Sequence, residues 1–472
     1  MLSLEFQSLR QIYAAGCLAP SQVIEAIYDR IEARGDDGVW ILVVPRDSAL
    51  QRACALEALD DADKRKRPLF GLPFSIKDCI DVAGMPTTAG CPGFAYTATK
   101  TNLAVQRAMD AGAILIGKTN LDQFATGLVG VRTPYGVAEN PFNRDYIPGG
   151  SSSGAAVSVA SELVSFAFGT DTGGSGRVPA GFNNIVSLKP TLGLLSRVDM
   201  VNACRSLDTI AIFALTAPDA LEVLDICAAR DPADVFARTP PAAPARTSGD
   251  RGPFTFAAPR ADQRQFFGNA DAQALFDEAL RELARMGGRA TEVDYEAFLE
   301  VNEFLFNGPW LAERLVSLKS FIRDNPQAIH PVTREIILGG AAYSAADMVA
   351  GVHRLKELRG RISRQFDGID VLVVPTAGTI YRVREIEADP ITLNAGMGYY
   401  TNFVNLLDMA AVTVPNGFLS NGLPMGVTFI GRAFSDGYLA ALGGAYHGRR
   451  VSRLGATDFP VPEPREFGVA AH

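Results

Sequence analysis

A lysine and two serines are the residues of this chain best suited to nucleophilic chemistry. Lys77 ends the apolar run GLPFSIKD, Ser151 lies in GGSSSG, and Ser175 lies in GTDTGGSGRVPA. The first histidine of the chain is His330, far downstream of both serines, so a histidine-based triad has little local support. The pattern therefore indicates that a lysine is the base that activates a serine.

Lys77 can act as a base only if its pKa is strongly lowered, because a lysine in water has a pKa of ~10.4. Burial lowers the pKa of an amine, and Phe74, Ile76 and Ile80 give Lys77 an apolar setting. If the strand continues through this point, Asp78 faces the opposite side and does not pair with the amine. A surface lysine at the end of a strand is the ordinary alternative.

The serine-rich stretch GGSSSG, residues 149–154, is expected to be a rigid turn. A run of glycine and serine is more often a flexible connection than a site. Here it is followed directly by AAVSVASELVSFAFG, which is first small and then apolar. We therefore expect the run to open a buried helix.

The glycine-rich turn DTGGSG is suited to stabilising negative charge on a substrate oxygen. Its glycines let the backbone approach a substrate closely, and converging amides stabilise the oxyanion that forms during acyl transfer. The amides expected to converge belong to Thr172, Gly173, Gly174 and Ser175. Asp171 and Arg177 flank the turn and can pair to hold it. The ordinary alternatives are a glycine turn after a strand and two unrelated loop charges.

The composition argues against several classes of protein. The chain has 472 residues, 47% of them hydrophobic, and a formal net charge of -8, which disfavours binding to nucleic acid or to an anionic membrane. Its six cysteines are sparse and form no CxxC pair, as expected in a reducing compartment. No basic segment followed by an apolar core opens the sequence, and no run of about 18 apolar residues occurs. We therefore expect a cytoplasmic protein.

Apolar periodicity predicts an α/β enzyme. Residues 1–66 carry apolar residues at three- and four-residue spacing, which predicts a layer of helices. From about residue 70 short apolar runs alternate with helical stretches, a pattern typical of a sheet covered by helices. We expect an α/β core over 67–460, a surface loop at 237–253 and a short tail at 461–472. After the loop, FTFAAP, a helix near 271–286 and RATEVDY predict a strand–helix–strand unit.

The order and spacing of Lys77, Ser151 and Ser175 resemble those of the amidase signature family. The resemblance extends over most of the chain, through GKTNLDQFATG, NPFN, FNNIVSLKPTLGLLS and YTNFVNLLDMAAVTVPNGF. It implies an α/β/α fold in which helices cover both faces of a large mixed sheet, and a reaction that needs no metal or organic cofactor. By the same resemblance, Lys77 activates Ser151, which follows a cis peptide bond and relays the proton of the nucleophile Ser175.

Further phrases look like the allophanate hydrolases within that family, including the amidase part of urea amidolyases. They include DQFATGLVGVRTPYG, ACRSLDTIAIFALT and GPWLAER. These enzymes cleave the terminal amide of an anion, and the resemblance assigns the substrate carboxylate to Arg314, whose guanidinium can form two parallel hydrogen bonds with it. Gly308 and Pro309 are expected to start the helix that carries Arg314. An exposed arginine beside Glu313 is the ordinary alternative.

Two further positions belong to the substrate pocket that the resemblance implies. Gly127 ends GKTNLDQFATG, and Phe306 stands where the family has a tyrosine that helps to hold the substrate. The hydroxyl of that tyrosine is missing here. The extra carboxy-terminal domain that full-length relatives commonly carry is expected to be absent, because only a short tail follows the amidase core.

We therefore expect a hydrolase of a small anionic amide, with allophanate as the favoured substrate in the use of urea or s-triazine nitrogen, acting as a homodimer. Three alternatives stay open. The chain could be another amidase of the family with a neutral or aryl substrate, or the glutaminase component of a tRNA-dependent amidotransferase. It could also be a catalytically silent amidase-like scaffold, which the intact Lys77, Ser151 and Ser175 argue against.

Overall fold

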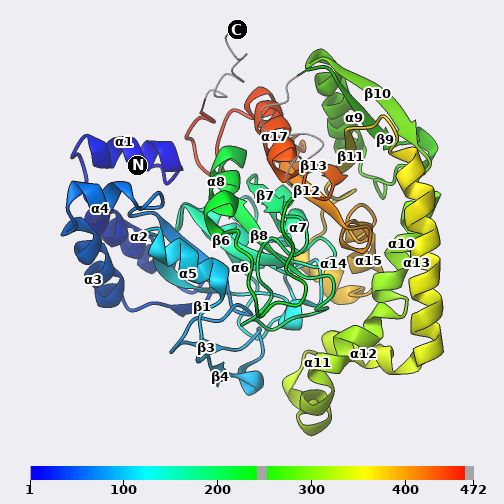
Figure 1. Ribbon diagram of the computed structural model, residues 1–472, viewed down its shortest axis with the longest axis horizontal. Coiled ribbons are helices and arrows are strands. Elements are labelled where there is room, and N and C mark those ends of the chain that lie inside the picture. The colour runs from blue at the N-terminus through cyan, green and yellow to red at the C-terminus, as the bar shows by residue number, and fades with distance from the viewer. Residues whose placement is uncertain (1, 242–251, 463–472) are drawn as a thin grey trace.

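A mixed sheet of 11 strands runs through the molecule (Figure 1). The computed structural model describes residues 2–241 and 252–462. In spatial order the strands are β1 (Trp40–Val43), β5 (Ile114–Thr119), β2 (Pro73–Lys77), β6 (Phe166–Asp171), β8 (Thr209–Ala214), β7 (Val186–Lys189), β12 (Met409–Phe418), β13 (Pro424–Arg432), β11 (Val371–Pro375), β9 (Phe254–Pro259) and β10 (Gly288–Val293). A separate two-stranded sheet pairs β3 (Pro86–Thr87) with β4 (Tyr96–Thr97).

Helices surround this sheet (Figure 1). They are α1 (Phe6–Ala14), α2 (Pro20–Arg34), α3 (Arg46–Glu57), α4 (Asp61–Arg65), α5 (Leu103–Asp110), α6 (Ser153–Ala160), α7 (Arg177–Phe182), α8 (Ala217–Cys227), α9 (Ala270–Arg285), α10 (Glu296–Phe306), α11 (Trp310–Asp324), α12 (Pro331–Gly339), α13 (Ala345–Gln365), α14 (Val383–Ala388), α15 (Thr392–Met397), α16 (Phe403–Leu406) and α17 (Asp436–Arg450). The predicted fold class, a large mixed sheet with helices, is confirmed.

Helices pack against both faces of the sheet, as β12 illustrates. Val412 and Val414 lie against Gly443 of α17. The residue between them, Thr413, shares a buried hydrogen bond with Thr428 of β13. Because successive residues of a strand point to opposite faces, Thr413 faces away from α17. Helix α7 packs against the other face of the sheet. Its Gly181 lies against Thr376, which shares a hydrogen bond with Thr428.

The strand β2 positions the lysine through the same alternation. Ser75 shares a 2.9 Å hydrogen bond with Ser158 of α6, and Lys77 lies two residues further along the same face. The strand β6 runs parallel to β2 with Ile76 paired to Phe168. The carboxyl ends of both strands therefore lie side by side, and the two segments that follow them meet at one edge of the sheet.

Several expectations about organisation can be compared with the structure. The predicted strand–helix–strand unit is confirmed, because β9 and β10 pair in parallel around α9. The prediction that residues 1–66 are purely helical is wrong at β1, a four-residue run that pairs antiparallel with β5 at the sheet edge. Residues 242–251 of the predicted loop and 463–472 of the predicted tail lie outside the described residues. The division into a core, a loop and a tail stays a prediction.

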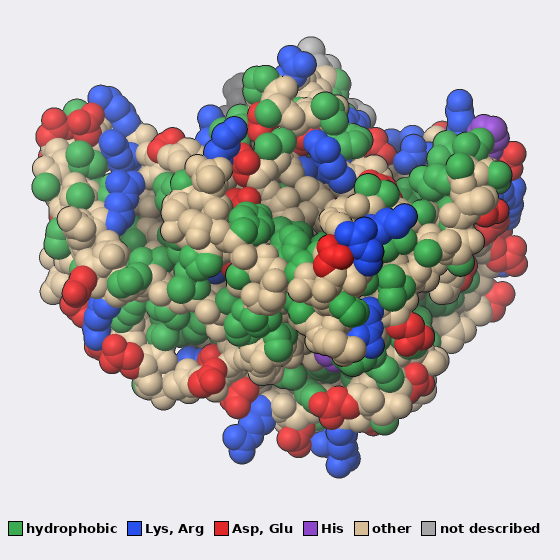
Figure 2. Space-filling model, turned by 90° about the horizontal axis from the view of Figure 1, so that it is seen from below, with side chains coloured by type: hydrophobic (Ala, Val, Ile, Leu, Met, Phe, Trp, Pro, Cys, Tyr) green, Lys and Arg blue, Asp and Glu red, His purple; other side chains and the backbone are tan. Residues whose placement is uncertain are grey.

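Charge and hydrophobicity are distributed without a single dominant patch on the face seen in Figure 2. There, acidic and basic side chains are interspersed around a central area of apolar and uncharged side chains. All six cysteines are unpaired, four of them buried. Within the described ranges no single helix is long and apolar enough to cross a membrane; α12 and α13, with the turn after α12, pass such a test only as a pair bent by 93°.

An aromatic cluster supports the strands that carry the site. Phe166 of β6 stacks on Phe74 of β2 with ring centroids 5.1 Å apart, and Phe6 and Phe168 meet its edge. We expect Phe166→Ala to lower the free energy of unfolding by about 3–5 kcal/mol, because it leaves a cavity at the centre of this cluster. Urea denaturation followed by circular dichroism measures the loss. A change below about 1 kcal/mol would show that the cluster does not support β2 and β6.

Candidate active site

Lys77 is the last residue of β2 and its side chain is completely buried. Its Nζ lies 2.7 Å from Ser151 Oγ and 2.7 Å from Thr170 Oγ1. The carboxylate of Asp78 instead pairs with Lys118 at 2.9 Å. The expectation that Asp78 does not pair with Lys77 is confirmed, although the strand on which it depended ends at Lys77. In the described part of the chain the amine contacts two hydroxyl groups and forms no ion pair.

Burial lowers the pKa of Lys77, because the charged ammonium loses its hydration in the interior. The Cys79 thiol and the carboxylates of Asp122, Asp208 and Asp171 oppose this shift but do not cancel it. A neutral amine carries a lone pair and can accept a proton. The electrostatics of the site therefore favour the form of Lys77 that a base requires.

Ser151 is held in a tightly packed turn. The peptide bond between Gly150 and Ser151 is cis, as the family resemblance implies. The carbonyl of Ser151 accepts a 3.1 Å hydrogen bond from the Asp122 amide, and a Cβ at Gly150 would collide with the Asp122 carboxylate. The helix α6 begins at Ser153 and all eight of its residues are buried. The predicted buried helix after GGSSSG is confirmed.

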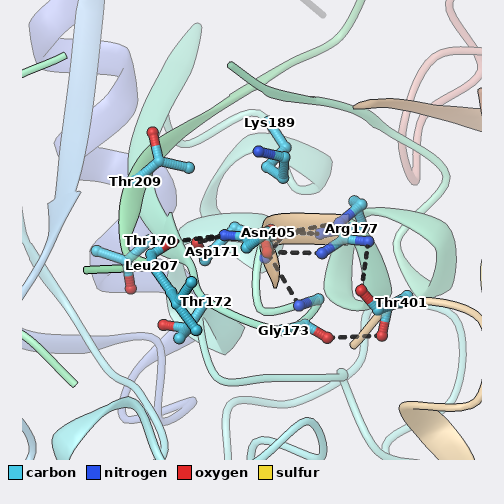
Figure 3. Close-up of polar contacts among 12 residues, drawn as sticks. Thr170, Asp171, Thr172, Gly173, Arg177, Lys189, Leu207, Thr209, Thr401 and Asn405 are labelled. Carbon is cyan, nitrogen blue, oxygen red and sulfur yellow. Dashed lines mark hydrogen bonds and ion pairs between the residues drawn. The ribbon is translucent and has the colours of Figure 1, made fainter. Parts of the chain in front are cut away.

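The turn that carries Ser175 is built around the carboxylate of Asp171 (Figure 3). Arg177 donates to it from Nε at 2.9 Å and from its second terminal nitrogen at 2.8 Å. The amides of Gly174 and Gly176 donate to the same carboxylate at 2.9 and 3.1 Å. Burial would raise the pKa of Asp171, but the charge and hydrogen bonds of Arg177 outweigh it and keep that pKa below its ordinary value. The predicted ion pair is confirmed.

Residues of the segment 401–405, far away in sequence, also hold this turn by hydrogen bonds (Figure 3). Arg177 donates from its other terminal nitrogen to the carbonyl of Thr401 at 2.9 Å, and the Thr401 hydroxyl donates to the carbonyl of Gly173 at 2.6 Å. Asn405 donates from Nδ2 to the carbonyl of Asp171 at 2.8 Å. The family-like phrase YTNFVN therefore lies directly behind the nucleophile turn.

One expectation about the oxyanion site needs correction. The amide of Gly174 already donates to the Asp171 carboxylate, so it is not free to bind a substrate oxygen. Within the described residues no hydrogen bond engages the amides of Thr172, Gly173 or Ser175. These three amides remain the candidates for stabilising an oxyanion.

Arg314 is buried in α11 and only 2% exposed. It donates to Thr126 Oγ1 at 3.3 Å and lies 4.8 Å from the ring centre of Phe306. Neighbouring Glu313 accepts instead from the amide and hydroxyl of Ser206. Burial lowers the pKa of Arg314, yet a guanidinium stays protonated. The alternative of an exposed arginine is wrong: Arg314 is a buried cation, and in the described residues Asp208 and Glu313 act on its charge without forming a salt bridge with it.

The remaining pocket residues lie in the same region. A Cβ added to Gly173 would lie 3.6 Å from Phe306 Cε2, so the Phe306 ring borders the nucleophile turn on one side and Arg314 on the other. Gly127 follows Thr126, the residue that contacts Arg314, and its φ of 157° is one that L side chains rarely adopt. The structure therefore brings Phe306, Arg314 and Gly127 together near the turn. Their roles toward a substrate stay predictions.

Sequence reasoning missed three side chains that orient the site. Thr170 shares the Lys77 amine with Ser151, and Thr126 holds the Arg314 guanidinium. Asp208 accepts from the Thr172 hydroxyl beside the turn, and burial raises the pKa of Asp208. Thr126 and Asp208 lie within the quoted phrases DQFATG and ACRSLDT, but neither phrase reveals a contact with a residue far away in sequence. Within the described residues no group of three or more His, Cys, Asp or Glu side chains is placed to hold a metal ion.

Fold and site together define an amide hydrolase architecture, and the chain belongs to the amidase family: residues 22–439 match the model described as Amidase. It is 39% identical over 431 residues to the urea amidolyase of Saccharomyces cerevisiae, a match that covers 91% of this chain and 23% of the yeast protein. It is 31% identical over 480 residues to one component of the glutamyl-tRNA(Gln) amidotransferase of Acidobacterium capsulatum, covering 94% and 99% of the two chains.

Among solved structures, the chain superposes on the allophanate hydrolase of Kluyveromyces lactis with a TM-score of 0.89 and 34% identity. That match covers 98% of this chain and 76% of the other. The chain spans about a quarter of the length of the urea amidolyases that it resembles. The predicted family is therefore confirmed over nearly the whole chain.

The lowered pKa of Lys77 predicts the pH dependence of activity. The base must be unprotonated, so kcat/KM should fall as the pH drops through the pKa of Lys77, and burial should place this fall below the ordinary lysine range. Lys77→Met fills the same space without a base and should lower kcat/KM by about 10²–10⁴-fold. A pH profile of amide hydrolysis for both proteins measures this. If Lys77→Met keeps most of the rate at pH 7, Lys77 is not the base.

Proposed function

We propose that this protein hydrolyses allophanate, the carboxylated form of urea, with release of ammonia. The observation that supports this substrate most is Arg314, a buried guanidinium that forms no ion pair with the described residues and lies beside the nucleophile turn. Asp208 and Glu313 act on the charge of Arg314 without forming a salt bridge with it, and a buried cation that no carboxylate contacts is costly. A substrate carboxylate would supply this direct contact and match the guanidinium with two parallel hydrogen bonds.

For the acylation step we give Lys77, Ser151 and Ser175 the roles that the family resemblance implies, and the contact of Lys77 with Ser151 supports this assignment. Thr170 accepts one N–H of the neutral amine, which leaves the lone pair of Nζ available to the Ser151 hydroxyl. As Ser175 Oγ attacks the terminal carbonyl carbon, its proton passes to Ser151 Oγ and the Ser151 proton passes to Lys77. The negative charge that forms on the carbonyl oxygen is placed near the free amides of the turn.

Collapse of this intermediate breaks the terminal C–N bond. The proton on Lys77 returns through Ser151 to the departing nitrogen, and ammonia leaves. The acyl group stays on Ser175 Oγ as an ester of the N-carboxylated carbamate. Water then attacks the ester carbonyl, gives one proton to the same relay, and releases the product with Ser175 regenerated. No step requires a group from outside the chain other than water.

Ammonia release from allophanate, compared with neutral amides, tests this proposal. Biuret is the sharpest comparison, because a carboxamide replaces the carboxylate and the rest of the molecule is unchanged. We expect kcat/KM for allophanate to exceed that for biuret by at least about 100-fold, and Ser175→Ala to abolish both activities. Equal rates on the two substrates would remove the basis for an anionic substrate.

A neutral-amide amidase is the second candidate, and Phe306 favours it. A phenyl ring bordering the turn is suited to an apolar substrate group. Similarity to a component of a glutamyl-tRNA(Gln) amidotransferase keeps the glutaminase reaction as a weaker variant. A cytoplasmic location and a homodimer belong to the proposal as well, and light scattering of the purified protein tests the dimer.

Arg314→Lys tests the proposed carboxylate contact. A lysine keeps the charge but loses the two-pronged geometry, so we expect kcat/KM for allophanate to fall by about 10–100-fold and that for biuret to change less than about threefold. Arg323→Lys, an exposed change on the same helix, is the matched control and should leave both values unchanged. Equal losses on both substrates would make Arg314 a structural residue.

Phe306→Tyr tests whether the missing hydroxyl lowers kcat/KM for the substrate. If the substrate is allophanate, the added donor should raise kcat/KM by about 1–2 kcal/mol, roughly five- to thirtyfold. If the natural substrate places an apolar group here, the hydroxyl is buried without a partner and kcat/KM should fall by a comparable factor. Measuring kcat/KM for allophanate and for one apolar amide, before and after the substitution, shows whether kcat/KM rises or falls. A fall for allophanate with strong activity on the apolar amide would contradict the proposed substrate.

A further inference from the structure

Asn402 has a buried carboxamide that bonds to nothing in the described chain. The residue is 7% exposed, and its Oδ1 is enclosed without a hydrogen-bond partner. Five other asparagines share an enclosed, unpartnered Oδ1, and in each of them Nδ2 donates to a backbone carbonyl; they are Asn183, Asn184, Asn202, Asn302 and Asn405. Asn402 differs from all five because its Nδ2 also forms no hydrogen bond with the described residues.

The carboxamide of Asn402 lies against the nucleophile turn. A Cβ at Gly173 would lie 2.9 Å from Asn402 Oδ1, and a Cβ at Gly398 would collide with Asn402 Nδ2. Glycine at both positions therefore makes room for this side chain. The same imagined Cβ of Gly173 lies 3.6 Å from Phe306, whose ring contacts Arg314. Asn402 is thus beside the turn, on the side that leads to the buried cation.

The hydrogen-bonding groups of this free carboxamide determine which ligand groups can bind beside it. It offers one acceptor oxygen and two donor hydrogens, and an unpaired buried acceptor lowers stability unless a ligand engages it. A substrate with its scissile carbonyl at the turn and its carboxylate at Arg314 has its central atom between the two. In a ureido compound that central atom is a nitrogen that carries a hydrogen.

We propose that Asn402 is a substrate-binding residue that accepts a hydrogen bond from the central N–H of a ureido substrate. This inference rests on the proposed function, and it adds a source of specificity that Arg314 does not supply. Arg314 distinguishes a carboxylate from a neutral group. Asn402 distinguishes a central N–H from a methylene group.

Malonamate separates the two contributions, because it keeps the carboxylate and terminal amide of allophanate and replaces the central N–H with CH₂. We expect Asn402→Leu, which preserves the volume, to lower kcat/KM for allophanate by about tenfold. The same variant should change kcat/KM for malonamate by less than about twofold. Asn402→Ala should give the same pattern. Equal losses on both substrates, or no loss on either, would overturn the proposal.

Asn416→Ala is the matched control for a buried asparagine. Its carboxamide is paired inside the chain, with Nδ2 donating to the carbonyl of Leu275 and Oδ1 accepting from Tyr446. We expect this control to lower Tm and to leave the ratio of the two kcat/KM values unchanged. Asn402→Leu should leave Tm unchanged or raise it, because it removes an unpaired acceptor and breaks no internal hydrogen bond. A large drop in Tm for Asn402→Leu would indicate a structural role.

If the chain does not hydrolyse allophanate, two neutral substrates can still test the contact of Asn402 with a central N–H. Biuret carries the central N–H and malonamide carries CH₂, and neither has a carboxylate. Failure on allophanate with activity on this pair would contradict the proposed function alone. A selective loss of biuret hydrolysis in Asn402→Leu would still support the contact with the central N–H, whereas equal losses on biuret and malonamide would refute it.

Discussion

The site depends on a buried amine that forms no ion pair in the described chain. Lys77 is completely buried at the end of β2, and its hydrogen-bond partners are two hydroxyl groups. The nearest carboxylate in sequence, Asp78, is committed to Lys118. Had Asp78 paired with Lys77, the ion pair would have raised the pKa of the amine and removed its capacity to act as a base. Because Asp78 pairs with Lys118 instead, it leaves the Lys77 amine without an ion pair.

Burial has a different consequence for Arg314 than for Lys77. An amine responds to burial by losing its proton, whereas a guanidinium keeps its proton and remains a charge that needs a partner. The chain thus places one buried base and one buried cation near a single turn, and the Asp171–Arg177 pair holds that turn in place. This combination is the physical basis of the proposed amide cleavage and of the proposed preference for an anion. In the proposed function, the carboxylate of the substrate provides the direct ionic contact that Arg314 lacks within the described residues.

Local patterns were enough to predict much of this arrangement. The sequence indicated that Asp78 need not pair with Lys77, although β2 ends at Lys77 and Asp78 lies just beyond it. The charges that flank DTGGSG predicted the Asp171–Arg177 pair. The contacts of Thr170 and Thr126 and the place of Asn402 beside the turn could not be foreseen, because each depends on segments that only the folded sheet brings together. The oxyanion prediction failed at Gly174 for a related reason: sequence shows that an amide exists but not which acceptor already holds it. The short edge strand β1 was missed because four apolar residues between helices carry little periodicity.

The protonation state of Lys77 can be measured directly in the folded protein. Lysine labelled with ¹³C at Cε reports the charge of each amine by NMR, and the Lys77 signal is assigned by its absence in Lys77→Met. The account predicts that this signal titrates below the ordinary lysine range, because burial lowers the pKa of the Lys77 amine. A Lys77 signal that stays in the charged form up to the range of exposed lysines would contradict the central claim.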